Sequence, residues 1–267
     1  MINILSILFL TAQVPFVDLP STPVATGNSL SANLIAYYKF DEASGNAQDS
    51  SGGNFHLTQT GTSSSTTGLI ATSRAIGNTT RFSTGDHANF EVDTGPYTIM
   101  FWVNFASLPI EGQQSIVSKY DYGLNGSYKI GTLKAGSYVA FEFAIMTSDE
   151  SGYSLQVPTA ITINTWYCIC ARINPTAEYF YLDVRAVNGS WLPDLSNYSG
   201  AILNSATSLV VNGVLDSSLV LQEKLNTGTR IDELAFWRRS LTDCERDKYF
   251  NLGLGLPLVN FNTLPCQ

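Results

Sequence analysis

Charge is scarce in this sequence, and basic charge is scarcer than acidic charge. Only 13% of the 267 residues are Asp, Glu, Lys or Arg, about half of the roughly 25% that is typical of soluble domains. The chain has 14 Lys and Arg against 22 Asp and Glu, so its formal net charge is −8. A nucleic-acid backbone is held by clustered basic side chains, and the only basic pair is Arg238-Arg239. We therefore expect no nucleic-acid partner.

Long apolar runs are also missing. The N-terminal stretch Ile2–Leu10 is interrupted by two polar residues and is far shorter than the ~20 apolar residues that a membrane helix needs, so we expect no membrane span. Pro15, Pro20 and Pro23 follow, which makes residues 1–32 typical of an extended arm. We expect this arm to dock on a neighbouring protein subunit. A cleaved signal segment is the alternative, although no Lys or Arg precedes the apolar stretch.

The few cysteines lack the spacing of a zinc site. The four cysteines show no CxxC motif and no Cys/His cluster with zinc spacing. Cys168 and Cys170 lie two residues apart on a predicted strand, so their side chains share one face, and we interpret them as buried or free thiols. A disulfide between Cys244 and Cys266 is compatible with the sequence but is not required by it.

Strand-forming residues dominate what the chain does contain. Hydrophobic residues make up 44% of it and aromatic residues 12%, enough for a sizeable core. Dense apolar runs such as Thr98–Phe105, Tyr138–Met146 and Ile161–Arg172 are separated by turns that contain glycine. Short strands at this spacing indicate an all-β sandwich or barrel.

One short helix is predicted near the C-terminus. Ser240 or Thr242 is suited to cap its first turn, where Asp243 also favours helix formation. Lys248 falls in the expected last turn, and Gly253 offers a stop.

Four motifs occur in an order that resembles the laminin-G-like, concanavalin A-like lectin jelly roll. They are LIAYYKFDEASGNAQDSSGGNFHLTQTG, YTIMFWVNF, ITINTWYCICARI and IDELAFWRRSLTDCERDKYFNLG. The resemblance covers residues 33–257, between the arm and a C-terminal tail at 258–267. Gly53 departs from it, because Asn is usual there, and residues 80–85 form a loose version of the usual Phe-Asp-Gly turn.

This resemblance implies an all-β, two-sheet antiparallel jelly-roll sandwich with six or seven strands in each sheet. It also implies that Trp102, Trp166 and Trp237 occupy packing sites in the core or at its rim.

The carboxylates do not form a pattern typical of a glycosidase, which needs two of them facing the substrate about 5–10 Å apart. Similar sandwich hydrolases carry a Glu-x-Asp-x-x-Glu run, and none occurs here. Glu142 stands alone in an apolar run, and the adjacent Asp232 and Glu233 point to opposite faces of a strand. Neither His56 nor His87 lies in a nucleophile setting. We therefore do not expect an enzyme.

A structural calcium ion is the predicted cofactor. Calcium takes carboxylate and backbone carbonyl oxygens, and Asp49 opens the glycine-containing turn Asp49–Gly53. In similar jelly rolls calcium ties an early turn to the late Ile-Asp-Glu strand, which implies Asp49 and Asp232 as its ligands. The alternative is a turn in which Asp49 bonds its own backbone.

Loop aromatics are the candidate ligand-binding residues. Sugar sites place an exposed aromatic plane on loops at a rim, and Trp191, Tyr198, Tyr120 and Tyr122 lie in predicted loops. Packing of Trp191 against the sandwich or a neighbour is the alternative.

Taken together, the arm and the sparse charge favour a non-enzymatic structural or attachment protein. We expect a virion component, such as a capsid decoration or fibre protein, or another extracellular surface assembly. The alternative is a secreted carbohydrate-binding lectin-like module that binds surface glycans.

Overall fold

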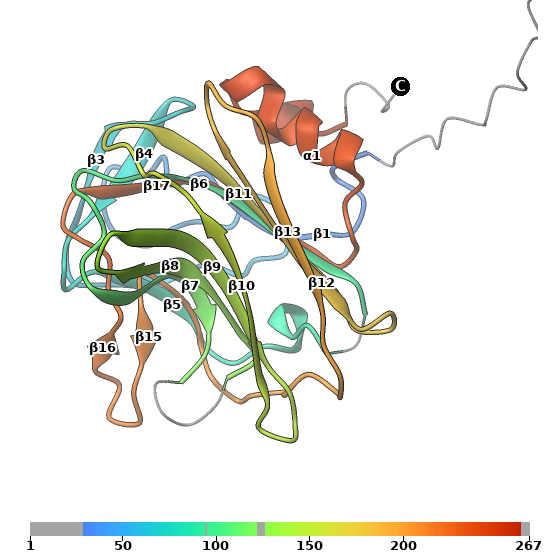
Figure 1. Ribbon diagram of the computed structural model, residues 1–267. Coiled ribbons are helices and arrows are strands. Elements are labelled where there is room, and N and C mark those ends of the chain that lie inside the picture. The colour runs from blue at the N-terminus through green and yellow to red at the C-terminus, as the bar shows by residue number, and fades with distance from the viewer. Residues whose placement is uncertain (1–28, 94, 122–125, 263–267) are drawn as a thin grey trace, which may run out of the picture.

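Two large antiparallel sheets face each other in the computed structural model, which describes residues 29–93, 95–121 and 126–262 (Figure 1). The first sheet has eight strands: β1 (Leu34–Tyr38), β3 (Ser63–Thr67), β4 (Thr72–Ile76), β6 (Tyr97–Asn104), β11 (Trp166–Asn174), β12 (Tyr179–Ala186), β13 (Leu192–Asn197) and β17 (Thr229–Trp237). The second has seven: β2 (Thr58–Thr60), β5 (Arg81–Thr84), β7 (Gly112–Lys119), β8 (Tyr128–Ala135), β9 (Tyr138–Met146), β10 (Gly152–Pro158) and β14 (Leu209–Val211). The predicted all-β sandwich is confirmed, with one sheet larger than expected.

Strands that are distant in the sequence lie side by side in both sheets. The order is β13-β12-β11-β6-β17-β4-β3 in the first, with β1 also paired to β17, and β10-β9-β8-β7-β14-β5-β2 in the second. The first strand is thereby joined to the last, with Tyr38 opposite Leu234. A small hairpin of β15 (Val214–Leu215) and β16 (Leu221–Gln222) projects from the second sheet (Figure 1).

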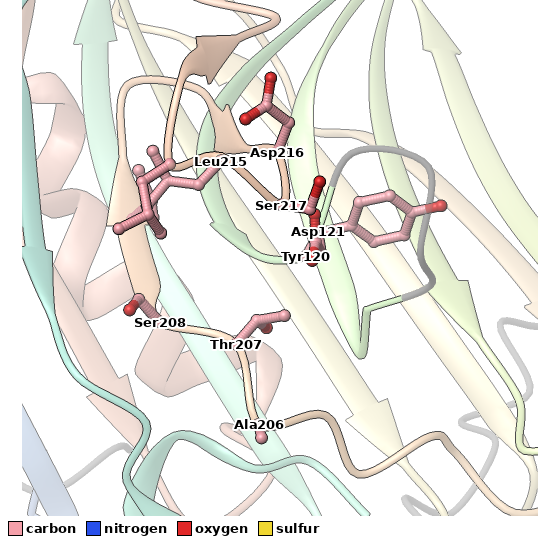
Figure 2. A pocket seen from close by; sticks show the side chains of 10 residues that line it. Tyr120, Asp121, Ala206, Thr207, Ser208, Leu215, Asp216 and Ser217 are labelled. Atoms are coloured by element: carbon pink, nitrogen blue, oxygen red, sulfur yellow. The ribbon is translucent and has the colours of Figure 1, made fainter.

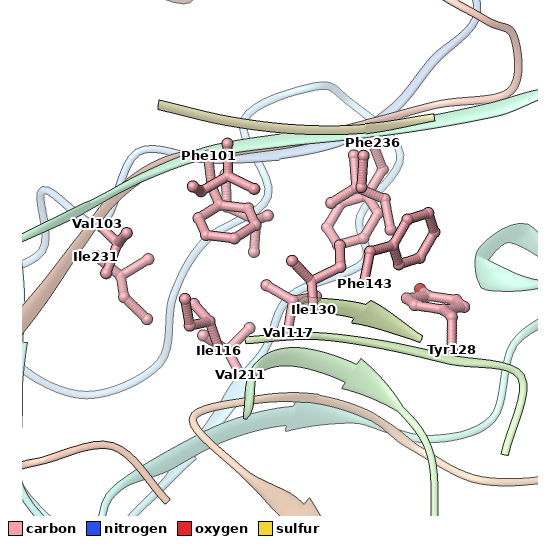
Figure 3. Packing of buried hydrophobic residues seen from close by; sticks show 14 of the residues in the cluster. Phe101, Val103, Ile116, Val117, Tyr128, Ile130, Phe143, Val211, Ile231 and Phe236 are labelled. Carbon is pink, nitrogen blue, oxygen red and sulfur yellow. The ribbon is translucent and has the colours of Figure 1, made fainter. Parts of the chain in front are cut away.

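The main core lies between the sheets and follows from the alternation of side chains along each strand. On β8 and β9, Tyr128, Ile130, Phe141 and Phe143 point inward and are almost fully buried (Figure 3). Phe143 meets Phe180 of β12 edge to face, with ring centroids 5.5 Å apart. Such aromatic pairs add roughly 0.5–1.5 kcal/mol to the effect of burial alone.

A second apolar cluster covers the outer face of the eight-stranded sheet. All eight residues of β6 are buried, because its outward side chains pack beneath the helix α1 (Asp243–Phe250). Trp102 stacks on Phe250 with centroids 5.2 Å apart, and Trp237 is also fully buried there. Trp166 packs against the same cluster. The predicted packing role of the three tryptophans is confirmed, on the outer side of a sheet.

Helix α1 begins as the sequence predicts and ends earlier. Thr242 is its N-cap and forms a capping box with Glu245. The helix ends at Asn251, which adopts the left-handed conformation with φ 47°, two residues before the predicted stop at Gly253. Short 3₁₀ turns occupy Ala88–Phe90, Asn251–Gly253 and Leu258–Asn260.

Both described ends of the chain are part of the second cluster. Leu30 and Phe261 are fully buried there, and the Leu30 amide donates to the Phe261 carbonyl. The packed unit therefore extends a few residues beyond the predicted limits of 33 and 257. The rest of the predicted arm, residues 1–28, lies outside the described residues.

The cysteines divide into two kinds. Cys168 and Cys170 are free and buried in the second cluster, as predicted, and burial raises the pKa of the Cys170 thiol to about 12. Cys244 takes part in a disulfide. Its predicted partner, Cys266, lies outside the described residues, so that pairing stays a prediction.

Candidate functional site

The outer face of the seven-stranded sheet carries a row of polar side chains. Because Tyr128, Ile130, Phe141 and Phe143 point into the core, their neighbours on the same strands point outward. We call this row the polar face and define it by seven residues: Gln113, Ser115, Tyr120, Lys129, Glu142, Gln156 and Glu223. They come from four neighbouring strands and from the loops that follow β7 and β16.

A continuous hydrogen-bond network joins six of these side chains, and Tyr120 contacts it through its ring. The Glu142 carboxylate accepts from Gln113 Nε2 at 2.7 Å and from Gln156 Nε2 at 3.3 Å. Lys129 Nζ donates to Gln113 Oε1 at 2.9 Å and to the two Glu223 oxygens at 2.8 and 3.1 Å. The network orients its members before any ligand arrives, which reduces the entropic cost of binding.

Tyr120 lies at the junction of two hollows on this face. Its ring centroid is 5.1 Å from Lys129 Nζ. The first hollow, of about 260 Å³, lies over Gln113, Lys129 and Glu142. The second, of about 190 Å³, lies beneath the β15–β16 hairpin (Figure 2). Its lining includes Tyr120, Asp121, Val210, Leu215, Asp216 and Leu219.

Gly131 keeps the middle of the polar face open. It is paired with Ser115 on β7 and with Glu142 on β9, at the centre of the row. A Cβ atom at this position would collide with the Gln114 carbonyl oxygen, beside the irregular pairing after Ser115. The close approach of the backbone therefore requires glycine here.

The electrostatics of the polar face suit binding better than acid–base catalysis. Both carboxylates, Glu142 and Glu223, are held by side-chain donors. A general acid must be free to donate its proton to a substrate, and Glu223 is instead engaged with the Lys129 ammonium at 2.8 Å. Burial, Glu223 and Glu142 together raise the pKa of Tyr120, so its hydroxyl stays protonated.

The predicted site residue Trp191 lies on the opposite side of the sandwich. It packs beside α1 on the second cluster, with its ring centroid 5.5 Å from that of Phe250. Its Nε1 donates to Asp247, and the Arg246 guanidinium lies 4.4 Å from its ring centroid. These contacts match the alternative of a tryptophan folded back over the sandwich.

The predicted tyrosines are not brought together. Tyr198 is only 4% exposed and packs on Phe180 in the main core. Among the candidate aromatics that the structure describes, only Tyr120 lies on the polar face. Tyr122 lies outside the described residues.

Asp49 holds the glycine-containing turn through backbone hydrogen bonds, which was the alternative to a role as a calcium ligand. Its carboxylate accepts from the backbone N–H groups of Tyr37 at 3.0 Å, Ser51 at 2.9 Å and Phe55 at 3.0 Å. The Asp49 amide donates to His56 Nδ1 at 3.0 Å. These bonds tie the turn to β1.

Asp232 is engaged elsewhere. One of its oxygens accepts from the amides of Leu69 and Ile70, at 2.8 and 3.3 Å, and the other has no hydrogen-bond partner. Burial raises the pKa of this carboxyl to about 8, and burial likewise raises the pKa of Glu233 to about 8.

Backbone amides donate to three of the four carboxylate oxygens of the two candidate calcium ligands. Asp49 and Asp232 have no hydrogen-bond partner in common, and their partners are N–H donors rather than the oxygen atoms that calcium requires. Within the described part of the chain, no group of three or more His, Cys, Asp and Glu side chains could hold a metal. The calcium ion stays a prediction, and we derive no function from it.

Most of the polar face was not predicted from the sequence. Glu142 was predicted only as a single acid in an apolar strand, and Tyr120 only as a loop aromatic, so their proximity was not expected. A signal was present, because Lys129, Gly131 and Glu142 interrupt apolar alternation on the solvent side of two consecutive strands. Gln113, Gln156 and Glu223 join them only through strand pairing and the fold of the hairpin.

Membrane insertion through a helix finds no support in the part of the chain that the structure describes. No described helix has the length and apolarity needed to cross a bilayer.

Comparison with known proteins identifies the family of the chain. A sequence profile described as the concanavalin A-like lectin/glucanases superfamily matches residues 76–245, more than half of the chain. Among curated proteins, no sequence matches the chain.

Solved structures with the same fold include toxin binding domains. The binding domain of Paraclostridial mosquitocidal protein 1 matches with a TM-score of 0.65 and 16% identity, over 83% of this chain and 52% of its own. The binding domain of botulinum neurotoxin serotype G matches with a TM-score of 0.60 and 15% identity, over 83% and 51%. The chain thus spans about half the length of these two domains.

A third similar structure is matched over nearly its whole length. It is domain 4 of an extracellular arabinanase from Geobacillus stearothermophilus, in complex with arabinotriose. Its TM-score is 0.57 at 18% identity, over 83% of this chain and 98% of the domain. At these identities the three structures establish the shared fold.

Proposed function

Because the chain belongs to the concanavalin A-like lectin/glucanases superfamily, we propose that it is a non-enzymatic attachment protein that binds glycans on its polar face. The observation that carries the proposal is the preorganised row of hydrogen-bonding side chains around Tyr120, above two adjoining hollows. Sugars are bound by fixed polar groups together with an aromatic or apolar surface. The polar face supplies both.

The similar structures support this proposal by their own ligands. Two are binding domains of toxins, and a third was solved with arabinotriose bound. Another binding domain of a botulinum neurotoxin was solved in complex with SialylT. Glycan recognition is therefore compatible with this fold.

The location that we propose is a virion surface, as a capsid decoration or fibre, or another extracellular assembly. Cys244 supports an oxidising compartment, because its disulfide would be rare in a reducing cytosol. Leu252, Leu254 and Val259 are largely exposed next to the buried chain ends, which offers apolar surface to a neighbouring subunit. A secreted glycan-binding module is the alternative.

Binding to a glycan array tests the proposed site. The wild-type protein is expected to bind at least one oligosaccharide class saturably, and Tyr120→Ala is expected to weaken that binding by at least about tenfold, because it removes the ring between the hollows. Trp191→Phe is the matched control, since Trp191 lies on the other sheet, and it should bind like wild type. Thermal melts verify that both variants are folded.

Two results would refute the site. If the array shows no hits with folded wild-type protein, glycan binding is wrong. If Trp191→Phe loses binding and Tyr120→Ala retains it, the binding surface lies on the other side of the sandwich.

A further inference from the structure

We propose that the polar face selects uncharged sugars and rejects acidic ones, because its lysine is already neutralised by Glu223. This inference rests on the proposed glycan-binding function and names the class of glycan. A lysine beside a tyrosine on the outer face of a sheet would ordinarily suit a sugar that carries a carboxylate or sulfate. The contacts of Lys129 lead to the opposite conclusion.

Lys129 has no donor left for an acidic ligand. An ammonium group has three N–H donors. Nζ lies 2.9 Å from Gln113 Oε1 and 2.8 and 3.1 Å from the two oxygens of Glu223. Lys129 is only 7% exposed, and the side chain of Glu223 is similarly buried, at 10%. Both members of the ion pair are thus largely shielded from a ligand.

The remaining charges around the hollows are negative. Glu142 lines the first hollow, and Asp121 and Asp216 line the second. Glu142 is only 5% exposed and each of its oxygens accepts one side-chain donor, so its carboxylate contributes negative charge beneath the first hollow. Burial raises the pKa of Asp121, and the neighbouring charge of Asp216 acts in the same direction.

An acidic sugar would therefore be repelled along the whole face. Glu142, Asp121 and Asp216 all add negative charge, while Lys129 and Glu223 cancel. Repulsion between unit charges about 5 Å apart near a protein surface is large enough to weaken binding by at least about tenfold. A neutral sugar avoids this cost.

Paired glycans test the inference. The probes are immobilised oligosaccharides presented with and without a terminal sialic acid, together with neutral and uronic-acid oligosaccharides of equal length. Wild-type protein is expected to bind the neutral member of each pair at least about tenfold more tightly. Raising the salt concentration should narrow the difference, because salt screens the repulsion.

A charge-neutralising variant gives the sharper result. Glu223→Gln keeps the size of the side chain but leaves the Lys129 ammonium unneutralised, so binding of the acidic member should improve by at least about fivefold. The double variant Glu223→Gln/Lys129→Met should lose that gain. Glu178→Gln is the matched control, because Glu178 is an exposed acid on the turn between β11 and β12 of the other sheet, and it should leave the preference unchanged.

The outcomes separate this inference from the function on which it rests. Wild-type binding that is equal for both members, or tighter for the acidic member, overturns the selectivity and leaves glycan binding intact. A Glu223→Gln variant without any gain for acidic sugars overturns the role assigned to the ion pair. Binding of neither member by folded protein refutes the glycan-binding function itself.

Discussion

At the scale of single residues, the carboxylates have different structural roles, and each role follows from the hydrogen-bond partners of the carboxylate. Asp49 collects three backbone N–H donors and shapes a turn. Glu142 collects two side-chain amides on the outer side of β9. Asp232 is buried with one oxygen unpartnered. Carboxylates therefore serve here as a turn anchor, as a member of a side-chain network or as a buried acid.

Asp49→Ala tests whether the early turn depends on amide donors or on calcium. The substitution leaves three N–H groups without their acceptor and should lower the free energy of unfolding by about 2–4 kcal/mol, since bonds to charged groups contribute about 1.5–3 kcal/mol each and water partly replaces them. The loss, measured by urea denaturation, should be the same in EDTA and in millimolar calcium. A calcium-dependent gain that appears in wild type and vanishes in Asp49→Ala would instead establish the ion.

At the scale of elements, α1 explains why the central strand β6 of the eight-stranded sheet is buried on both faces. It covers the outward side chains of the central strand β6, with Phe250 stacked on Trp102. The polar face of the other sheet, in contrast, is overhung by the β15–β16 hairpin, which Glu223 ties to Lys129 and Ser115. One face is therefore covered by packing, and the other is left hollowed and polar.

The start of α1 offers a direct comparison of the two caps that the sequence allowed. Thr242→Ala removes the hydroxyl that accepts from the Glu245 amide and should lower the free energy of unfolding by about 1 kcal/mol. Ser240→Ala, the matched control, should change it by less than about 0.5 kcal/mol. Chemical denaturation of both variants measures the difference, and a larger cost for Ser240→Ala would contradict the observed cap.

At the scale of the whole molecule, the buried chain ends and the polar face belong to opposite sides of the sandwich. Leu30 and Phe261 lie in the cluster outside the eight-stranded sheet, whereas Lys129 and Glu142 lie outside the seven-stranded sheet. Figure 1 shows α1 beside the first sheet, away from the β15–β16 hairpin. An assembly held through residues 1–28 would thus leave the polar face free to bind a ligand.

Removal of residues 1–28 tests this division of roles. The shortened protein should be monomeric by light scattering and should bind glycans with wild-type affinity, because Tyr120 and its neighbours are untouched. The full chain should bind equally well but form larger species. If the full chain is also monomeric, or if native material lacks this segment by mass spectrometry, the proposed arm-mediated assembly is wrong.

Local chemistry was sufficient to predict the class of fold, the capped helix and the inward strand residues, because each depends on neighbours within a few positions. Alternation along Tyr138–Met146 predicts which side chains face a core whatever sheet the strand joins. The motifs that resemble the laminin-G-like jelly roll extended this to two sheets. Trp191 could not be placed in this way, since its packing depends on a helix that begins some 50 residues later.

The polar face was decided by tertiary structure alone. Gln113, Lys129, Glu142 and Glu223 are spread over more than a hundred residues, and they meet only because β7, β8 and β9 pair and a hairpin folds back over them. Whether Lys129 is a free cation or a neutralised one depends on Glu223, 94 positions away. Charge state and ligand access are properties of contacts in space, and periodicity along a single strand carries no information about them.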